Sequence, residues 1–85
     1  MKVQETIRAK LQDAFSPEAL EVTDESHQHA GHAGARPGGE SHFRVRMKAA
    51  AFTGMSRVAR SRAVHAALSA ELAGPVHALA LELSE

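Results

Sequence analysis

An α+β fold, with elements in the order α-β-β-α(α)-β, is predicted by the pattern of apolar residues in this chain. Apolar side chains recur every fourth residue near the N-terminus, which is typical of an amphipathic helix. Residues 19–23 and 42–48 alternate between apolar and polar side chains, which is typical of half-buried strands. A second helical pattern at 56–72 precedes a nearly continuous apolar stretch at 76–83. We therefore expect a three-stranded mixed sheet packed against helices.

The first helix is expected from about Val3 to Phe15. One apolar stripe runs along it, formed by Val3, Ile7, Leu11 and Phe15. Polar and charged residues fill the positions between, which leaves the opposite face to solvent. Pro17 follows the helix and should end it, because proline disfavours helical backbone in the residue before it.

Two strands follow, at Ala19–Thr23 and His42–Lys48. In the second strand, alternate apolar residues share the face that should pack on the helices: Phe43, Val45 and Met47. The other face should meet solvent and carries His42, Arg44, Arg46 and Lys48. If the two strands pair as a hairpin, this basic face lies beside Glu21 and Thr23, which places opposite charges across the pair.

Ser56 is a candidate N-cap for a helical region that runs to about Leu72. Its buried stripe contains Val64, Leu68 and Leu72. Apolar residues in the first turn lie slightly out of phase with that stripe, so two short helices with a bend near residues 60–62 are as good an interpretation as one helix. Gly74 and Pro75 should end the helical region.

The last strand is expected over Val76–Leu83. Its large side chains share one parity, with His77, Leu79, Leu81 and Leu83 on the face that should bury against the helices. His77 begins this series and should therefore lie at the rim of the core. A strand that follows another through a helix normally lies parallel to it, which makes the sheet mixed.

Composition restricts the function classes. The 85 residues should form a single domain, residues 1–85, and the chain has no cysteine, so it has no disulfide and no thiolate ligand of its own. No apolar run approaches the ~18 residues that span a membrane, and the first ten residues lack the apolar core of a secretion signal. We expect a cytoplasmic protein without membrane association. We also expect no enzyme activity, because the sequence offers no serine-histidine-acid arrangement and no glycine-rich phosphate loop.

A histidine-rich loop joins the first two strands. The stretch DESHQHAGHAGARPGGESHF, residues 24–43, holds four of the six histidines. Its glycines and proline predict a mobile loop at residues 26–39. His27, His29 and His32 form an HxHxxH pattern. Alone, this pattern would suggest a zinc or nickel site, or only polar loop residues. A tight zinc site is not expected, because the triplet contains no thiolate or carboxylate. We interpret His42 and His65 as structural.

Three stretches carry a resemblance to a known family: DESHQHAGH with GGESHF around the loop, FTGMSRVARSRAV at the helical turn, and GPVHALAL at the last strand. Together with the first helix, they resemble the BolA family over essentially the whole chain. The resemblance implies a fold similar to a class II KH domain. It also implies an adaptor that binds a monothiol glutaredoxin and shares a 2Fe–2S cluster with it, in iron–sulfur trafficking or iron regulation. The alternative that the family offers is a DNA-binding transcriptional regulator of stress response and cell morphology.

The resemblance also assigns ligands to the cluster. The histidine of the family's GxVHAL motif falls on His77. The second ligand in the family, histidine or cysteine, comes from the loop between the first two strands and best matches His29, with His32 and His27 as alternatives. Because this chain has no cysteine, the thiolates must come from the glutaredoxin and from glutathione. We expect the chain to be monomeric alone, to hold no cluster by itself and to form a heterodimer with its partner.

A basic region supports the DNA-binding alternative. Residues 41–70 contain six basic residues and no acid. Arg57, Arg60 and Arg62 are the candidates for weak, salt-dependent contacts with a phosphate backbone. Arg60-Ser61-Arg62 stands here in place of the family's usual RHR triplet. No GXXG loop of the KH kind lies between the expected helices. Both features weaken a role in DNA binding. A simpler interpretation is a solvated charged face whose acids sit on the neighbouring strand.

Overall fold

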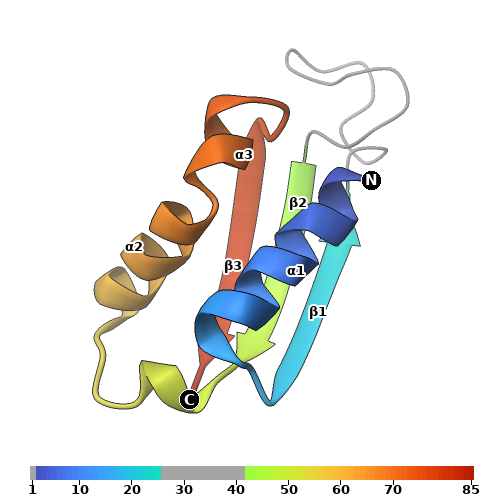
Figure 1. Ribbon diagram of the computed structural model, residues 1–85. Coiled ribbons are helices and arrows are strands. Elements are labelled where there is room, and N and C mark those ends of the chain that lie inside the picture. The colour runs from blue at the N-terminus through green and yellow to red at the C-terminus, as the bar shows by residue number, and fades with distance from the viewer. Residues whose placement is uncertain (1, 26–41) are drawn as a thin grey trace.

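The computed structural model describes residues 2–25 and 42–85 and confirms the predicted element order (Figure 1). The elements are α1 (Val3–Phe15), β1 (Ala19–Asp24), β2 (His42–Lys48), the 3-10 turn η2 (Ala50–Phe52), α2 (Arg57–Ala67), α3 (Ser69–Ala73) and β3 (Ala78–Ser84). The segment expected to be mobile, residues 26–39, lies outside the described residues.

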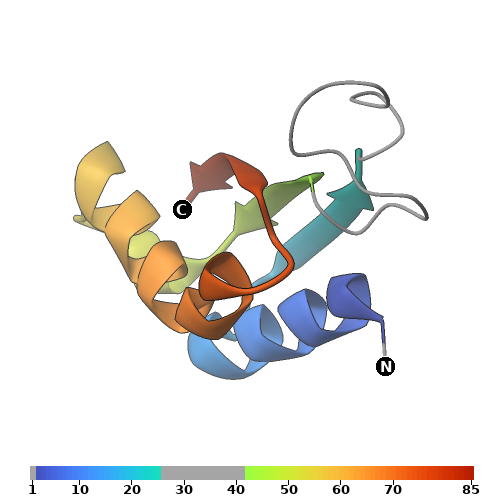
Figure 2. The ribbon, with the colours of Figure 1, turned by 90° about the horizontal axis from the view of Figure 1, so that it is seen from above.

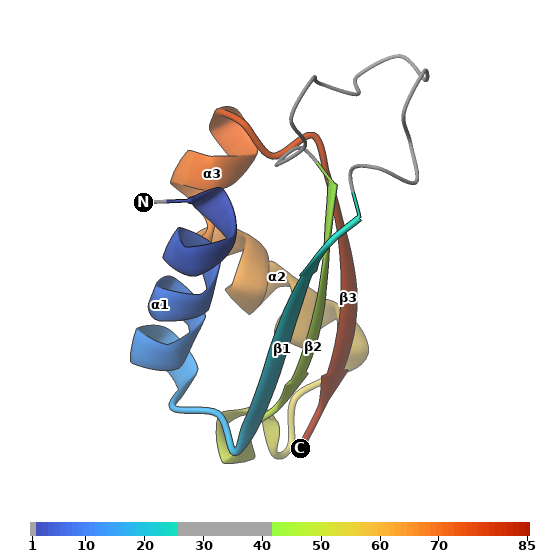
Figure 3. The ribbon, with the colours of Figure 1, turned by 90° about the vertical axis from the view of Figure 1, so that its right-hand side faces the viewer.

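The three strands form one mixed sheet in the order β1-β2-β3. β1 and β2 pair antiparallel, with Val22 opposite Val45, and β2 and β3 pair parallel, with Val45 opposite Leu81. The predicted sheet is therefore correct in its strand directions. In the described part of the chain, all helices pack on one face of the sheet, and no helix covers the other face (Figures 2 and 3).

The core lies between α1, the C-terminal half of α2 with the junction to α3, and the helix-facing side of the sheet. Its buried side chains are Ile7, Leu11, Val22, Phe43, Val45, Met47, Ala49, Phe52, Val64, Leu68 and Val76. The strand parity predicted for β2 is confirmed at these core positions. Leu79 and Leu81, which were expected to be buried, are only half-buried, because β3 is an edge strand that the helices cover in part.

The helical region between β2 and β3 is split, but not where a bend was expected. Ser56 caps α2 as predicted, with its Oγ accepting a hydrogen bond from the Ala59 amide at 3.1 Å. The helix then runs straight through residues 60–62 and breaks at Leu68, whose φ of −108° and ψ of 22° are not helical. Leu68 is 1% exposed, so this break places its side chain in the core. The proposed bend at 60–62 was therefore wrong in position.

Strand alternation fails at two histidine positions. β3 begins at Ala78, so Val76 and His77 do not follow its alternation: Val76 is buried and His77 is exposed. His42 was expected on the solvent face of β2, and that expectation is wrong, because the residue is only 7% exposed. Both differences arise at the same end of the sheet, where β2 and β3 start (Figure 1).

Candidate metal-binding site

His77 is positioned by a short turn between α3 and β3. The Glu71 carbonyl accepts hydrogen bonds from the Gly74 amide at 3.2 Å and from the Val76 amide at 2.9 Å. Val76 is 3% exposed and fixes the chain in the core one residue before His77. The turn is tight, because a Cβ atom on Gly74 would lie 3.3 Å from the Ala70 carbonyl oxygen. His77 therefore has an exposed ring, and its backbone is fixed by the Val76 hydrogen bond before it and by the start of β3 after it.

A second imidazole lies beside His77. The centroids of the His42 and His77 rings are 5.6 Å apart, and the ring planes are tilted by 53°. The parallel pairing of β2 and β3 explains the contact, because His42 is opposite Ala78, the residue after His77. The sequence contained this signal, since two histidines at the starts of two parallel strands meet if those strands are neighbours. We had interpreted His42 as a structural residue only.

The other predicted ligands are not placed by the structure. His29, His32 and His27 all lie outside the described residues, so their assignment as second ligands stays a prediction. Within residues 2–25 and 42–85, no three histidine or carboxylate side chains gather as a metal site. The two imidazoles are thus a pair of nitrogen donors without a third protein ligand in the described part of the chain.

The open face of the sheet next to this pair is covered by ion pairs. Arg44 Nε is 3.0 Å from Glu25 Oε2, and Arg44 Nη1 is 3.1 Å from Glu82 Oε2. Hydrogen bonds to Glu25 and then to Glu82 raise the pKa of the Arg44 guanidinium above its ordinary value. Arg46 forms an ion pair with Glu82, and Lys48 forms one with Glu18. The basic residues of β2 therefore have acidic partners, as the simpler interpretation of the charge pattern predicted.

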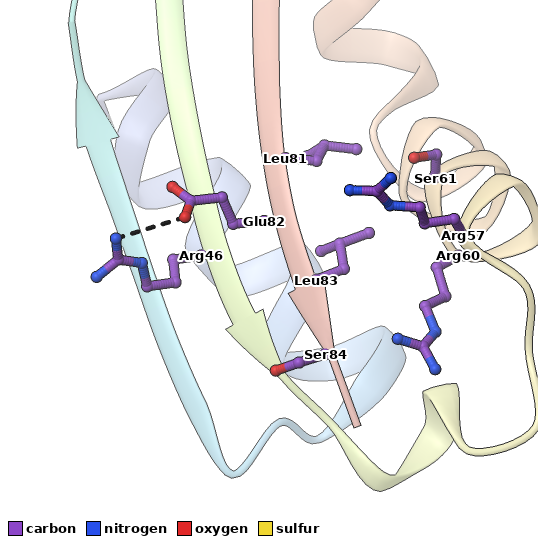
Figure 4. Close-up of a pocket in the computed structure, with 8 residues that line it drawn as sticks. All are labelled: Arg46, Arg57, Arg60, Ser61, Leu81, Glu82, Leu83 and Ser84. Carbon is purple, nitrogen blue, oxygen red and sulfur yellow. Dashed lines mark hydrogen bonds and ion pairs between the residues drawn. The ribbon is translucent and has the colours of Figure 1, made fainter.

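The three arginines that are candidates for DNA contacts lie on α2, beside the outer edge of β3: Arg57, Arg60 and Arg62. Arg57, Arg60 and Ser61 line a cavity of about 480 Å³ together with Leu81 and Leu83, whose side chains point from β3 toward α2 (Figure 4). Arg60 Nη2 lies 3.7 Å from Glu85 Oε1, and Arg60 Nε is buried and has no hydrogen-bond partner among the residues that the structure describes. Arg62 does not line this cavity. It lines an adjacent, more open depression with Arg57, Val58 and His65.

His65 is separate from the histidine pair. It is exposed on α2, and its Nδ1 lies 2.8 Å from the Ser61 carbonyl oxygen. The arrangement is local to one helical turn, which agrees with a structural role.

In the described part of the chain, the helices are all too short or too polar to cross a membrane.

Comparison with known proteins identifies the family. The family model described as BolA-like protein matches residues 11–85. An uncharacterised protein of Sinorhizobium sp. is 57% identical over 96% of this chain and 89% of its own length. BolA-like protein 1 of Bos taurus is 52% identical over 94% of this chain, which spans 56% of that relative's length. The protein named DNA-binding transcriptional regulator BolA in Escherichia coli is 44% identical over 95% of this chain and 73% of its own length.

A solved structure gives the same result for the fold. The BolA domain of SufE1 from Arabidopsis thaliana superposes with a TM-score of 0.86 at 41% identity, over 95% of this chain and 88% of that one. The family model and these relatives each match most of the chain, and the solved structure shares its fold. The chain therefore belongs to the BolA-like protein family.

Proposed function

We propose that this protein is a non-enzymatic adaptor that binds a monothiol glutaredoxin and shares a 2Fe–2S cluster with it, with His77 as its main ligand. The observation that carries the proposal is the exposed His77 ring, held on a fixed turn at the end of the sheet with a second imidazole 5.6 Å away. Iron–sulfur trafficking or iron regulation is the role that such an adaptor would serve.

The donor set fits such a shared group. The chain has no cysteine, so it can offer only nitrogen and oxygen ligands, and the thiolates must come from the glutaredoxin and from glutathione. Imidazole ligands in place of thiolates raise the reduction potential of a 2Fe–2S centre. His77 presents its ring at the molecular surface, where a second protein can reach it, while its backbone stays fixed by the Glu71 carbonyl.

The test is the visible spectrum of the mixed complex. The chain is purified together with a monothiol glutaredoxin and glutathione, and visible absorption and circular dichroism are recorded. We expect a cluster spectrum that differs from that of the glutaredoxin alone, and we expect His77→Ala to remove the difference. His65→Ala is the matched control, because His65 is also exposed but lies on α2. A wild-type spectrum from His77→Ala would refute the proposal.

A second candidate function is DNA binding by the α2 surface. Relatives in Escherichia coli and Vibrio cholerae are named DNA-binding transcriptional regulator BolA, and Arg57, Arg60 and Arg62 line the two hollows beside α2. Such binding would depend on neutralising phosphates and should weaken steeply with salt. The test is fluorescence anisotropy with labelled duplex DNA at several salt concentrations, comparing wild type with Arg57→Ala. Nanomolar, sequence-selective binding at physiological salt would reverse the ranking of the two functions.

A further inference from the structure

We propose that the space between α2 and the outer edge of β3 binds an acidic, extended segment of a partner protein, which pairs with β3 as an added strand. We call this space the α2–β3 groove and define it by Arg57, Arg60, Leu81 and Leu83, which line its main cavity. The groove lies along the second half of β3, whereas His77 precedes the start of that strand. It is therefore a docking surface separate from the histidine site, and it goes beyond the proposed function.

The backbone edge of β3 is available for pairing. Among the described residues, β3 pairs only with β2, in parallel register from Ala78 to Ser84. A strand edge of this kind can accept an extended chain, whose main-chain groups then hydrogen-bond to the strand. α2 does not close the edge, because a cavity of about 480 Å³ lies between the helix and the strand (Figure 4). An added strand would lie about 4.7–4.9 Å from β3, within this space.

The helical wall of the groove is positively charged. α2 has the sequence RVARSRAVHAA, with three arginines and no acidic residue. Arg57 and Arg60 point from α2 into the space beside β3 (Figure 4), and Arg62 lines the adjoining depression. The ion pair between Arg60 and Glu85 is long, at 3.7 Å, and Glu85 is largely exposed. This wall therefore complements carboxylates supplied by a partner, which can displace Glu85 from Arg60.

The strand wall of the groove determines which residues of the segment are acidic. Leu81 and Leu83 point from β3 toward α2, whereas the Glu82 carboxylate is held by Arg44 and Arg46 on the open face of the sheet. Alternate side chains of an added strand fall on the same two faces. Those on the helix side would place their methylene groups on the leucines and their carboxylates at the α2 arginines. Those on the open face would lie beside Glu82 and should be uncharged, so the segment alternates acidic and uncharged residues.

Other occupants fit the groove less well. Single-stranded nucleic acid binds through bases that stack on aromatic side chains, and the described residues that line the main cavity include no aromatic one. A second copy of this chain would offer its own β3, ALALELS, which has leucines where the arginines require carboxylates. An acidic segment of another protein satisfies the backbone edge, the leucines and the arginines together.

The test is a titration of ¹⁵N-labelled protein with designed peptides, followed by NMR chemical shifts and by amide hydrogen exchange. The probe is a short peptide of alternating glutamate and threonine, blocked at both ends. One control peptide has lysine in place of glutamate. A second control keeps the glutamates but has N-methylated threonines, which cannot donate the hydrogen bonds of a strand. Arg57→Glu tests the groove, and Arg8→Glu is its matched control, because Arg8 is also exposed but lies on α1.

We expect the glutamate peptide to shift resonances of α2 and β3 and to slow amide exchange in β3, while the lysine peptide does neither. Arg57→Glu should weaken binding of the glutamate peptide at least about tenfold, because it replaces attraction by repulsion, whereas Arg8→Glu should bind as wild type does. Equal binding of the N-methylated peptide, or equal weakening in both variants, would overturn the inference. The N-methylated peptide decides the matter on wild-type protein if Arg57→Glu does not fold.

The competing occupants give different results in the same experiment. Duplex DNA that shifts the same residues at physiological salt and binds more tightly than the glutamate peptide would assign the groove to nucleic acid and overturn the inference. Shifts at α2 and β3 that depend on protein concentration without any peptide would assign the edge to a second copy, and would also overturn it.

Discussion

Replacement of Lys10 by methionine is expected to destabilise the fold, because Lys10 neutralises a buried carboxylate. Lys10 Nζ lies 2.9 Å from Oε1 and 2.7 Å from Oε2 of Glu71, which ties α1 to α3. Glu71 is 8% exposed, and it is the residue whose carbonyl holds the turn before His77. Methionine keeps the aliphatic length of lysine and removes only the charge and its hydrogen bonds.

The size of the loss follows from the burial of the two partners. Breaking a fully buried ion pair costs about 3–5 kcal/mol, and a hydrogen bond to a charged group contributes about 1.5–3 kcal/mol. The Lys10 side chain is 39% exposed against 10% for Glu71, so water partly screens the pair. We therefore expect Lys10→Met to lower the free energy of unfolding by about 1–2 kcal/mol. In a domain of this size that corresponds to a fall in Tm of roughly 5–15 °C.

The assay is urea unfolding followed by far-UV circular dichroism. The control is Lys48→Met, whose partner Glu18 lies 3.2 Å away in a pair with side chains 54% and 67% exposed. Exposed pairs contribute little, so this control should change the free energy of unfolding by less than about 0.5 kcal/mol. A double-mutant cycle with Glu71→Gln isolates the pair. Equal losses in Lys10→Met and Lys48→Met, or a coupling energy near zero, would refute the reasoning.

Three further outcomes are expected. His77→Ala should leave the free energy of unfolding within about 0.5 kcal/mol of wild type, because the residue is exposed, while removing the mixed-cluster spectrum; a large loss of stability would contradict the surface position. Ser56→Ala should lower the free energy of unfolding in urea by about 1 kcal/mol, because Ser56 caps α2. Ser69→Ala should lower it much less, because the N-cap of α3 is Leu68 and not Ser69. Phe52→Ala should cost about 3–5 kcal/mol by the same assay, because Phe52 is 0% exposed; a smaller loss would show that the core can close around the cavity.

Much of the fold could be predicted because periodicity reports burial. The spacing of Ile7 and Leu11 gave the first helix, and the alternation around Val45 gave the second strand with its correct face. The break at Leu68 could not be found in this way, because it depends on how far the core extends under α3. An apolar stripe shows which side of a helix is buried, but not where the helix must bend to keep that side buried.

The site was predicted in part, for a related reason. His77 followed from a motif, and its turn follows from Gly74. His42 was missed because alternation assigns a face reliably only to residues inside a strand, and His42 is the first residue of β2. At the first residue of β2, burial depends instead on what lies beside the strand end. Only the parallel register of β2 and β3 shows that the neighbour is His77.

The free edge of β3 has a consequence for how the protein behaves in concentrated solution. β3 has the sequence ALALELS and, among the described residues, pairs only with β2. An apolar strand with an unpaired edge is a template for association with another copy of itself. Glu82 is the one charged residue of the strand, and its carboxylate is held by Arg44 and Arg46 on the open face of the sheet. Glu82 therefore supplies the only charge on β3 that opposes edge-to-edge association, so the colloidal stability of the protein should depend on this one carboxylate.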